Sequence, residues 1–235
     1  LDRSSAASDV YKRQVTDGVQ PGLYRRPLPE GLVAFSSPAG RVLFREALLA
    51  GGMEGYFPLA EQFQTQVEPT YCGISSLVMV LNALEVDPKR LWKGVWRWFS
   101  EDIADCCDQL SSIQAEGVSL DGLARLAHCN GVTVEVTHAE QTSLAQFRAL
   151  VQAVCSGGNK QALIASYSRQ ALGQTGEGHF SPIGGYHVEK DLVLLMDVAR
   201  FKYPPHWVPL SLLWSAMGSL DSVTGRTRGY AKVSR

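Results

Sequence analysis

One helix-forming segment, apolar on almost every face, constrains the fold of this chain most. Residues 73–84 read GISSLVMVLNAL, and Asp87-Pro88 stops the helix shortly afterwards. Its apolar residues recur at i, i+3, i+4 and i+7, and further apolar residues fill the positions between them. We therefore expect this helix to be buried on most sides, packed against other elements. The apolar stripe consists of Ile74, Leu77, Val78, Leu81 and Leu84.

Composition limits the classes of protein and partner. The chain has 235 residues, 45% of them hydrophobic, which is enough core for one large domain or two small lobes. With 22 basic and 23 acidic residues the formal net charge is −1, so no global field favours nucleic acid or an anionic membrane. No apolar run approaches 18 residues, and we expect no transmembrane helix. We expect neither nucleic acid nor a membrane as a partner.

The cysteine content and the first residues indicate the compartment. Five cysteines, an odd number in a chain of this length, favour free thiols and a reducing, cytoplasmic location. Residues 1–15 do not begin with Met and lack the apolar segment of a secretory signal. We set residues 1–15 aside as a non-native cloning remnant or a disordered tail, and expect residues 16–235 to hold the folded domain.

The order of the predicted elements indicates an α+β fold. Helical patterns dominate the first half of the chain, and antiparallel strand patterns the second, so we expect a helical lobe followed by a sheet lobe. Residues 16–40 and 56–71 are predicted to be irregular. Helices are predicted at 41–53, 73–84, 91–117, 119–131, 143–158 and 209–217, strands at 132–139, 161–168 and 228–234, and a hairpin at 178–201.

Cys72 stands immediately before the buried helix. The free N–H groups and the dipole of a helix N-terminus stabilise a thiolate, so this position suits a nucleophile. Free cysteine is also among the most buried residue types, and a lone thiol here is consistent with simple packing. On this residue alone both interpretations stay open.

Two further residues supply what a nucleophilic thiol needs, namely a base and a group that orients the base. His179 follows the Gly-rich segment QTGEG and opens the first strand of the hairpin. Asp197 follows five apolar residues at the end of the second strand, where an unpaired acid would be costly to bury. Pairing across the hairpin turn would bring the two side chains together. Of the other histidines, His128 is interpreted as packing or partly exposed, His138 lies at the end of a strand, and His206 is interpreted as structural.

An oxyanion in acyl transfer needs hydrogen-bond donors, which the backbone N–H of Cys72 and the side-chain amide of Gln66 could supply. Gln66, Cys72, His179 and Asp197 occur in the order found in papain-like cysteine peptidases, which have a helical lobe, a β-rich lobe and an active site between them. The amino-acid sequence resembles that of the phytochelatin synthase catalytic domain, in its eukaryotic form, over roughly residues 30–235. The resemblance is carried by FQTQVEPTYCGISSLVMVLNALEVDP, LWKGVWRWF, QTGEGHFSPIGGYH and DVARFKYPPHWVPLSLLW.

This resemblance implies a glutathione γ-glutamylcysteinyltransferase that makes phytochelatins and releases glycine. Cys72 would be the nucleophile, His179 the general base and acid, Asp197 its orienting group and Gln66 an oxyanion donor. The family is activated by heavy metals such as cadmium, zinc and copper, as glutathione thiolates, and no covalently bound cofactor is implied. The expected partners are glutathione and phytochelatin peptides, and a homodimer is one option for assembly.

The γ-glutamyl end of glutathione carries an α-amino group and an α-carboxylate, so its site should offer one acid and one arginine. Asp221 and Arg228 match family positions implicated in that contact. Arg200, Lys202 and Tyr203 follow Asp197 closely and are expected to contact the second substrate.

The resemblance leaves three matters open. Cys106, Cys107 and Cys129 match cysteines of the eukaryotic form and serve either packing or metal sensing, so we assign no metal site. The chain stops about where the catalytic domain ends, without the family's Cys-rich C-terminal domain. It is therefore a short form or, as the missing Met favours, a fragment. Hydrolysis of glutathione or its conjugates competes with transfer, and a metal-buffering thiol protein is the non-enzymatic alternative.

Overall fold

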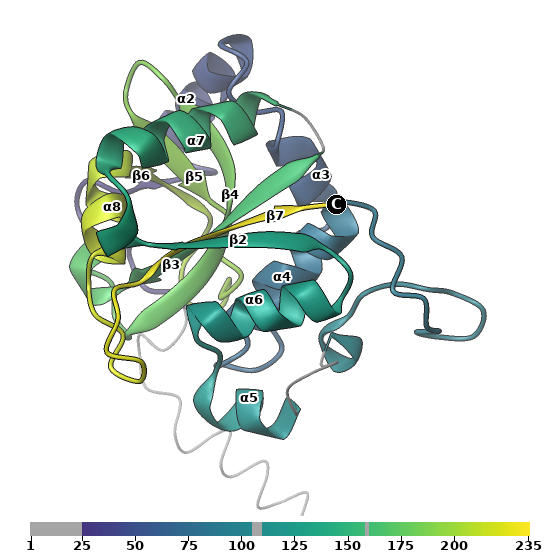
Figure 1. Cartoon of the computed structure of the whole chain (residues 1–235). Helices are drawn as coiled ribbons and strands as arrows, with labels where there is room; N and C mark the ends of the chain where they lie inside the picture. Colours follow the sequence, from purple (N-terminus) through teal and green to yellow (C-terminus); the bar gives the residue numbers. More distant parts are fainter. Residues whose placement is uncertain (1–24, 105–109, 158–159) are drawn as a thin grey trace, which may run out of the picture.

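A seven-stranded antiparallel sheet forms the centre of the protein (Figure 1). The structure is a computed structural model that describes residues 25–104, 110–157 and 160–235, so the expected tail at 1–15 lies outside the described residues. The strand order is β1-β6-β5-β4-β3-β7-β2. The strands are β1 (Val33–Ala34), β2 (Thr133–His138), β3 (Gln161–Ser168), β4 (Gly178–His187), β5 (Leu192–Leu195), β6 (His206–Pro209) and β7 (Gly229–Ser234).

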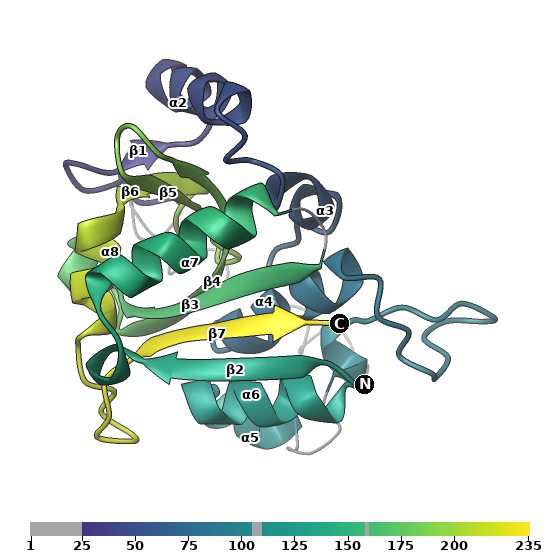
Figure 2. The same cartoon turned by 45° about the horizontal axis from the view of Figure 1, so that its top comes forward.

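Helices cover both faces of this sheet, as Figure 2 shows. Alternate residues of β3 enter different cores: Ile164 packs with α4 and α6, whereas Leu163 and Ala165 pack with α7 and α8. The α+β class is therefore confirmed. The helices are α2 (Pro38–Leu49), α3 (Tyr56–Glu61), α4 (Cys72–Ala83), α5 (Leu110–Glu116), α6 (Leu120–Cys129), α7 (Leu144–Ser156) and α8 (Leu210–Met217), with 3-10 turns η1 (Glu101–Ile103), η2 (Ala139–Gln141) and η3 (Gln170–Leu172).

The central position expected for the apolar helix is confirmed. Every residue of α4 from Gly73 to Ala83 is buried, and the helix packs against β4. The helices predicted at 119–131, 143–158 and 209–217 are also present within a few residues. Side-chain caps set two of these starts, since Ser119 accepts from the N–H of Gly122 and Ser143 from that of Gln146.

The helix predicted at 91–117 is present in its last part, as α5 (Leu110–Glu116), but is wrong for its first part. Residues 85–100 instead leave the body of the protein as an irregular arm. The arm reverses at Gly94, whose φ of +57° lies in the left-handed region. The N–H of Trp92 donates to the carbonyl of Trp96, and the N–H of Trp96 donates to that of Lys93, so the turn closes and no continuous helix runs through it.

Three short elements escaped prediction. The chain forms α3 within the segment 56–71, and β1 and β6 pair with each other at one sheet edge.

The helix predicted to start at residue 41 starts at Pro38, because the hydroxyl of Ser37 caps it. The sequence order of helices before strands holds only coarsely, since β2 precedes α7 and α8.

Within the described residues, no helix combines the length and apolar character needed to cross a bilayer.

Candidate active site

The first turn of α4 presents Cys72 to a cavity of about 520 Å³. No side chain caps this helix N-terminus, so its backbone N–H groups lie beside the thiol without a side-chain acceptor. The next residue must be small: a Cβ on Gly73 would lie 2.3 Å from Cγ1 of Val118 and 3.3 Å from the ring of Phe180. The close approach of the first turn of α4 to Val118, in the segment between α5 and α6, therefore depends on glycine.

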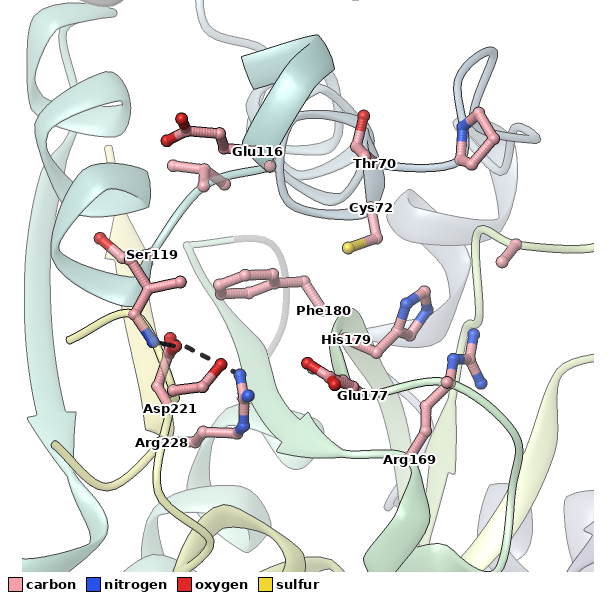
Figure 3. Close-up of a pocket in the computed structure, with 18 of the residues that line it drawn as sticks. Thr70, Cys72, Glu116, Ser119, Arg169, Glu177, His179, Phe180, Asp221 and Arg228 are labelled. Atoms are coloured by element: carbon pink, nitrogen blue, oxygen red, sulfur yellow. Dashed lines mark hydrogen bonds and ion pairs between the residues drawn. The ribbon is translucent and has the colours of Figure 1, made fainter. Parts of the chain in front are cut away.

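His179 and Asp197 meet as the hairpin pattern predicts. His179 is the second residue of β4, and Asp197 follows β5, its antiparallel neighbour. Nε2 of His179 donates to Oδ1 of Asp197 at 2.8 Å, and the N–H of Ala199 donates to the same oxygen at 2.9 Å. Since Nε2 is engaged by Asp197, Nδ1 is the ring nitrogen left for proton exchange with Cys72 (Figure 3).

The charges of Cys72, His179 and Asp197 stabilise one another. Burial alone would raise the pKa of the Cys72 thiol, but the charge and hydrogen bond of His179 and the N–H of Phe180 bring it below its ordinary value. The pKa of His179 is raised: burial and Arg169 oppose its charge, while Asp197 and Cys72 favour it more strongly. The site therefore favours a thiolate beside an imidazolium.

Sequence reasoning missed Arg169, which holds the other side of Asp197. Its Nη2 donates to both carboxylate oxygens, at 3.0 Å and 2.8 Å, and its guanidinium lies 5.2 Å from the ring centre of Tyr203. Both charged groups are almost completely buried. Burial would raise the pKa of Asp197, yet the charges of His179 and Arg169 hold it far below its usual range. The available signal was a charged residue directly after the apolar strand β3.

The side chain of Gln66 is buried close to this site, but its amide is already engaged. Nε2 donates to the carbonyls of Glu68 at 2.7 Å and Pro69 at 2.9 Å, while Oε1 has no hydrogen-bond partner. The N–H of Gln66 also donates to the carbonyl of Val198, next to Asp197. In this arrangement Gln66 braces the loop before α4, and an oxyanion role requires its amide to leave one of these carbonyls.

A second unpredicted residue, Glu101, ties that same loop to α4. Its Oε1 accepts from the hydroxyl of Ser75, one turn after Cys72, and its Oε2 accepts from the N–H of Val67 at 3.3 Å. The side chain is buried, which raises the pKa of the carboxyl. Glu101 therefore connects the segment before the thiol to the helix that carries it.

The expected γ-glutamyl contacts, Asp221 and Arg228, line the same cavity as Cys72 and His179. Figure 3 shows them grouped on one side of the view, with Cys72, His179 and Arg169 on the other. Nη1 of Arg228 lies 3.7 Å from Oδ2 of Asp221, and Nε of Arg228 has no partner although the side chain is 9% exposed. A cation and an anion therefore share one side of the cavity, with hydrogen-bonding capacity left over.

The structure separates the three residues expected at the second substrate. Lys202 lines the cavity. Tyr203 is buried, and its hydroxyl oxygen accepts from the N–H of Thr175 at 2.9 Å. Arg200 is not among the lining residues and lies over the ring of Phe63, 4.8 Å from its centre. Of the three, only Lys202 is placed to touch a ligand in the cavity.

The remaining cysteines play no visible part at this site. Cys155 lies on the buried face of α7, and burial raises the pKa of its thiol to about 12. Cys129 is disulfide-bonded, so the expectation of free thiols is wrong for this residue. Cys106 and Cys107 lie outside the described residues. In the part of the chain that the structure describes, no three His, Cys, Asp or Glu side chains form a group able to hold a metal ion.

Comparison with known proteins adds a family and named relatives. The family model described as phytochelatin synthase matches residues 23–230. Glutathione gamma-glutamylcysteinyltransferase 3 of Lotus japonicus is 52% identical over 215 residues, covering 91% of this chain and 45% of the relative. Glutathione gamma-glutamylcysteinyltransferase 1 of Arabidopsis thaliana is 51% identical over 214 residues, covering 91% and 44%. The Schizosaccharomyces pombe relative of that name is 44% identical, covering 94% and 53%. The chain thus spans about half the length of these relatives.

Proposed function

The chain belongs to the phytochelatin synthase family, and from this premise we propose that it is a glutathione γ-glutamylcysteinyltransferase. The observation that carries the proposal is Cys72, paired with His179 and Asp197, in a cavity that also holds Asp221 and Arg228. The first group supplies covalent chemistry, and the second matches the charges of an amino-acid end.

The first half-reaction begins with the Cys72 thiolate attacking the carbonyl carbon of the Cys–Gly bond of glutathione. The backbone N–H groups at the start of α4 stabilise the resulting oxyanion. The imidazolium of His179 gives its proton to the glycine nitrogen, the C–N bond breaks and glycine leaves. The acyl group stays on sulfur as a γ-glutamylcysteinyl thioester.

In the second half-reaction the α-amino group of another glutathione, or of a growing phytochelatin, attacks this thioester. His179 takes the proton of the attacking amine, and the thiolate leaves to restore the enzyme. Asp197 orients the imidazole in both steps and stabilises its charged form. We assign to Lys202, which lines the cavity, the contact with a carboxylate of the acceptor.

Substrate and setting follow from the same proposal. Heavy-metal ions, cadmium, zinc or copper, enter as thiolates of glutathione and raise activity as part of the substrate. The fold corresponds to the papain-like arrangement, with the active site between a helical lobe carrying Cys72 and a sheet lobe carrying His179. We place the reaction in the cytoplasm, with glutathione and phytochelatins as partners.

The deciding experiment incubates purified protein with glutathione and cadmium and resolves the thiol products by chromatography. Transfer predicts phytochelatins and free glycine in matching amounts. Abundant γ-glutamylcysteine with little oligomer would replace transfer by hydrolysis. Binding of cadmium without either product would leave the metal-buffering alternative and refute both enzymatic functions.

A further inference from the structure

The arm between α4 and η1 projects from the body of the protein in both views (Figures 1 and 2). Its outer part, residues 88–98, reads PKRLWKGVWRW. The only ladder pairing within it is the single bridge between Lys93 and Trp96, at the turn. The arm plays no part in the cavity that holds Cys72.

The outer part of the arm exposes large apolar side chains to an unusual degree. Trp96 is 71% exposed and Trp98 42%, and Val95 and Leu91 beside them are 81% and 65% exposed. Tryptophan is seldom left so open to water, because its large ring gains much from burial. In contrast, Phe99, the next residue, is 1% exposed and anchors the base of the arm in the core.

The arm is also a local concentration of positive charge. Residues 88–98 hold four cations and no acid, although the chain as a whole has a formal net charge of −1. Lys93 places its ammonium 4.6 Å from the ring centre of Trp92, and Arg97 pairs with Asp87 at the base, at 3.0 Å. The expectation of no membrane partner rests on the net charge of the whole chain, and that sum does not reveal a local cluster of cations. The four cations are Lys89, Arg90, Lys93 and Arg97.

We propose that this arm docks the protein on an anionic lipid surface. Tryptophan prefers the boundary between headgroups and acyl chains, and neighbouring Lys and Arg are attracted to anionic headgroups. The arm projects outward, and a lipid interface can yield around such a projection without a preformed groove. Charge complementarity therefore favours an anionic bilayer as the partner, to which the protein binds peripherally and reversibly through the tip of the arm.

Vesicle binding tests this inference independently of catalysis. The purified protein is sedimented with vesicles of phosphatidylcholine containing phosphatidylglycerol, and with vesicles of phosphatidylcholine alone. We expect binding to the anionic vesicles only, reduced by salt, with a blue shift of tryptophan emission on binding. Lys93→Glu and Trp96→Ala should each lower the partition coefficient by about tenfold.

Leu49→Ala is the matched control, because Leu49 is an apolar residue 88% exposed on α2, away from the arm. It should bind as the wild type does, and all three variants should keep the wild-type rate of glycine release from glutathione. Failure of the wild-type protein to sediment with anionic vesicles would overturn the proposal, as would equal binding to neutral vesicles. The proposal would also be overturned if the protein failed to bind vesicles but self-associated, and if Trp96→Ala abolished that self-association. The arm would then be a contact surface for a second copy of the chain.

Discussion

Two carboxylate–arginine pairs line or border the same cavity, and they differ in almost every physical respect. Asp197 is fully buried, and Arg169 donates to both of its oxygens at 2.8–3.0 Å while His179 binds one of them. Asp221 has a side chain 17% exposed, and its closest arginine nitrogen, on Arg228, lies 3.7 Å away. The first pair is closed to new partners, whereas the second is open to them.

This difference assigns different tasks to the two ends of the cavity. A buried carboxylate with all its charge compensated can fix the orientation of an imidazole, because no rearrangement is needed during reaction. A loose ion pair costs little to separate, so a ligand carrying one cation and one anion can replace it with two better contacts. We therefore expect substitutions at the Asp197 end to lower kcat and those at the Asp221 end to raise KM.

The largest effect is expected from Asp197→Asn. This change removes the charge that stabilises the imidazolium of His179 and leaves the buried Arg169 without its counter-ion. We expect kcat for glycine release to fall by about 10²- to 10⁴-fold with little change in KM, measured by steady-state kinetics on folded protein.

Asp191→Asn is the matched control for that measurement. Asp191 also accepts two hydrogen bonds from an arginine, Arg148, at 2.9 Å and 2.8 Å, but it lies in the turn after β4 and does not line the cavity. An equal loss of turnover in both variants would show that Asp197 matters only for stability, and the comparison would fail.

The second effect, at the open end, is expected from Arg228→Lys. Lysine keeps the positive charge but cannot present two parallel N–H groups to a carboxylate. We expect KM for glutathione to rise about 10- to 100-fold while kcat changes by less than about fivefold. A fall in kcat at unchanged KM would place Arg228 in the chemical step instead of in substrate binding.

A smaller effect is expected in the rates at which the two thiols, Cys72 and Cys155, are alkylated. The pKa of Cys72 is lowered whereas burial raises that of Cys155 to about 12, so at pH 7 a larger fraction of Cys72 than of an ordinary thiol is thiolate. We expect iodoacetamide at pH 7 to label Cys72 about tenfold faster than an ordinary thiol, and Cys155 to remain unlabelled, as read by peptide mass spectrometry. In Asp197→Asn this advantage at pH 7 should shrink, since the imidazolium that stabilises the thiolate is weakened. A Cys72 label that appears only above pH 9 would contradict the ion pair.

The smallest effect is expected from Glu101→Gln. The amide can still accept from the N–H of Val67 and donate to the hydroxyl of Ser75, so both contacts can persist, but without the charge of the carboxylate. We expect a loss of about 1 kcal/mol in the free energy of unfolding and a change in kcat of less than about threefold. A loss of kcat as large as that in Asp197→Asn would move Glu101 from a supporting to a central position in the account.

Local patterns explain what could be predicted from the sequence, and long-range contacts explain what could not. The position of α4 follows from its apolar periodicity, and the meeting of His179 with Asp197 follows from hairpin pairing. Arg169 reaches Asp197 across 28 residues and Glu101 reaches Ser75 across 26, and no periodicity reports such contacts. The tryptophans of the arm resemble a buried helical stripe and so predict a helix, whereas Gly94 at the turn indicates a break.

The central claim is that Cys72 carries the acyl group, and mass spectrometry after brief exposure to glutathione tests it most directly. The account predicts one γ-glutamylcysteinyl group on the peptide containing Cys72, none on the peptide containing Cys155, and none in Cys72→Ser, which should also lose glycine release. An acyl group on another residue, or glycine release at the wild-type rate by Cys72→Ser, would contradict it.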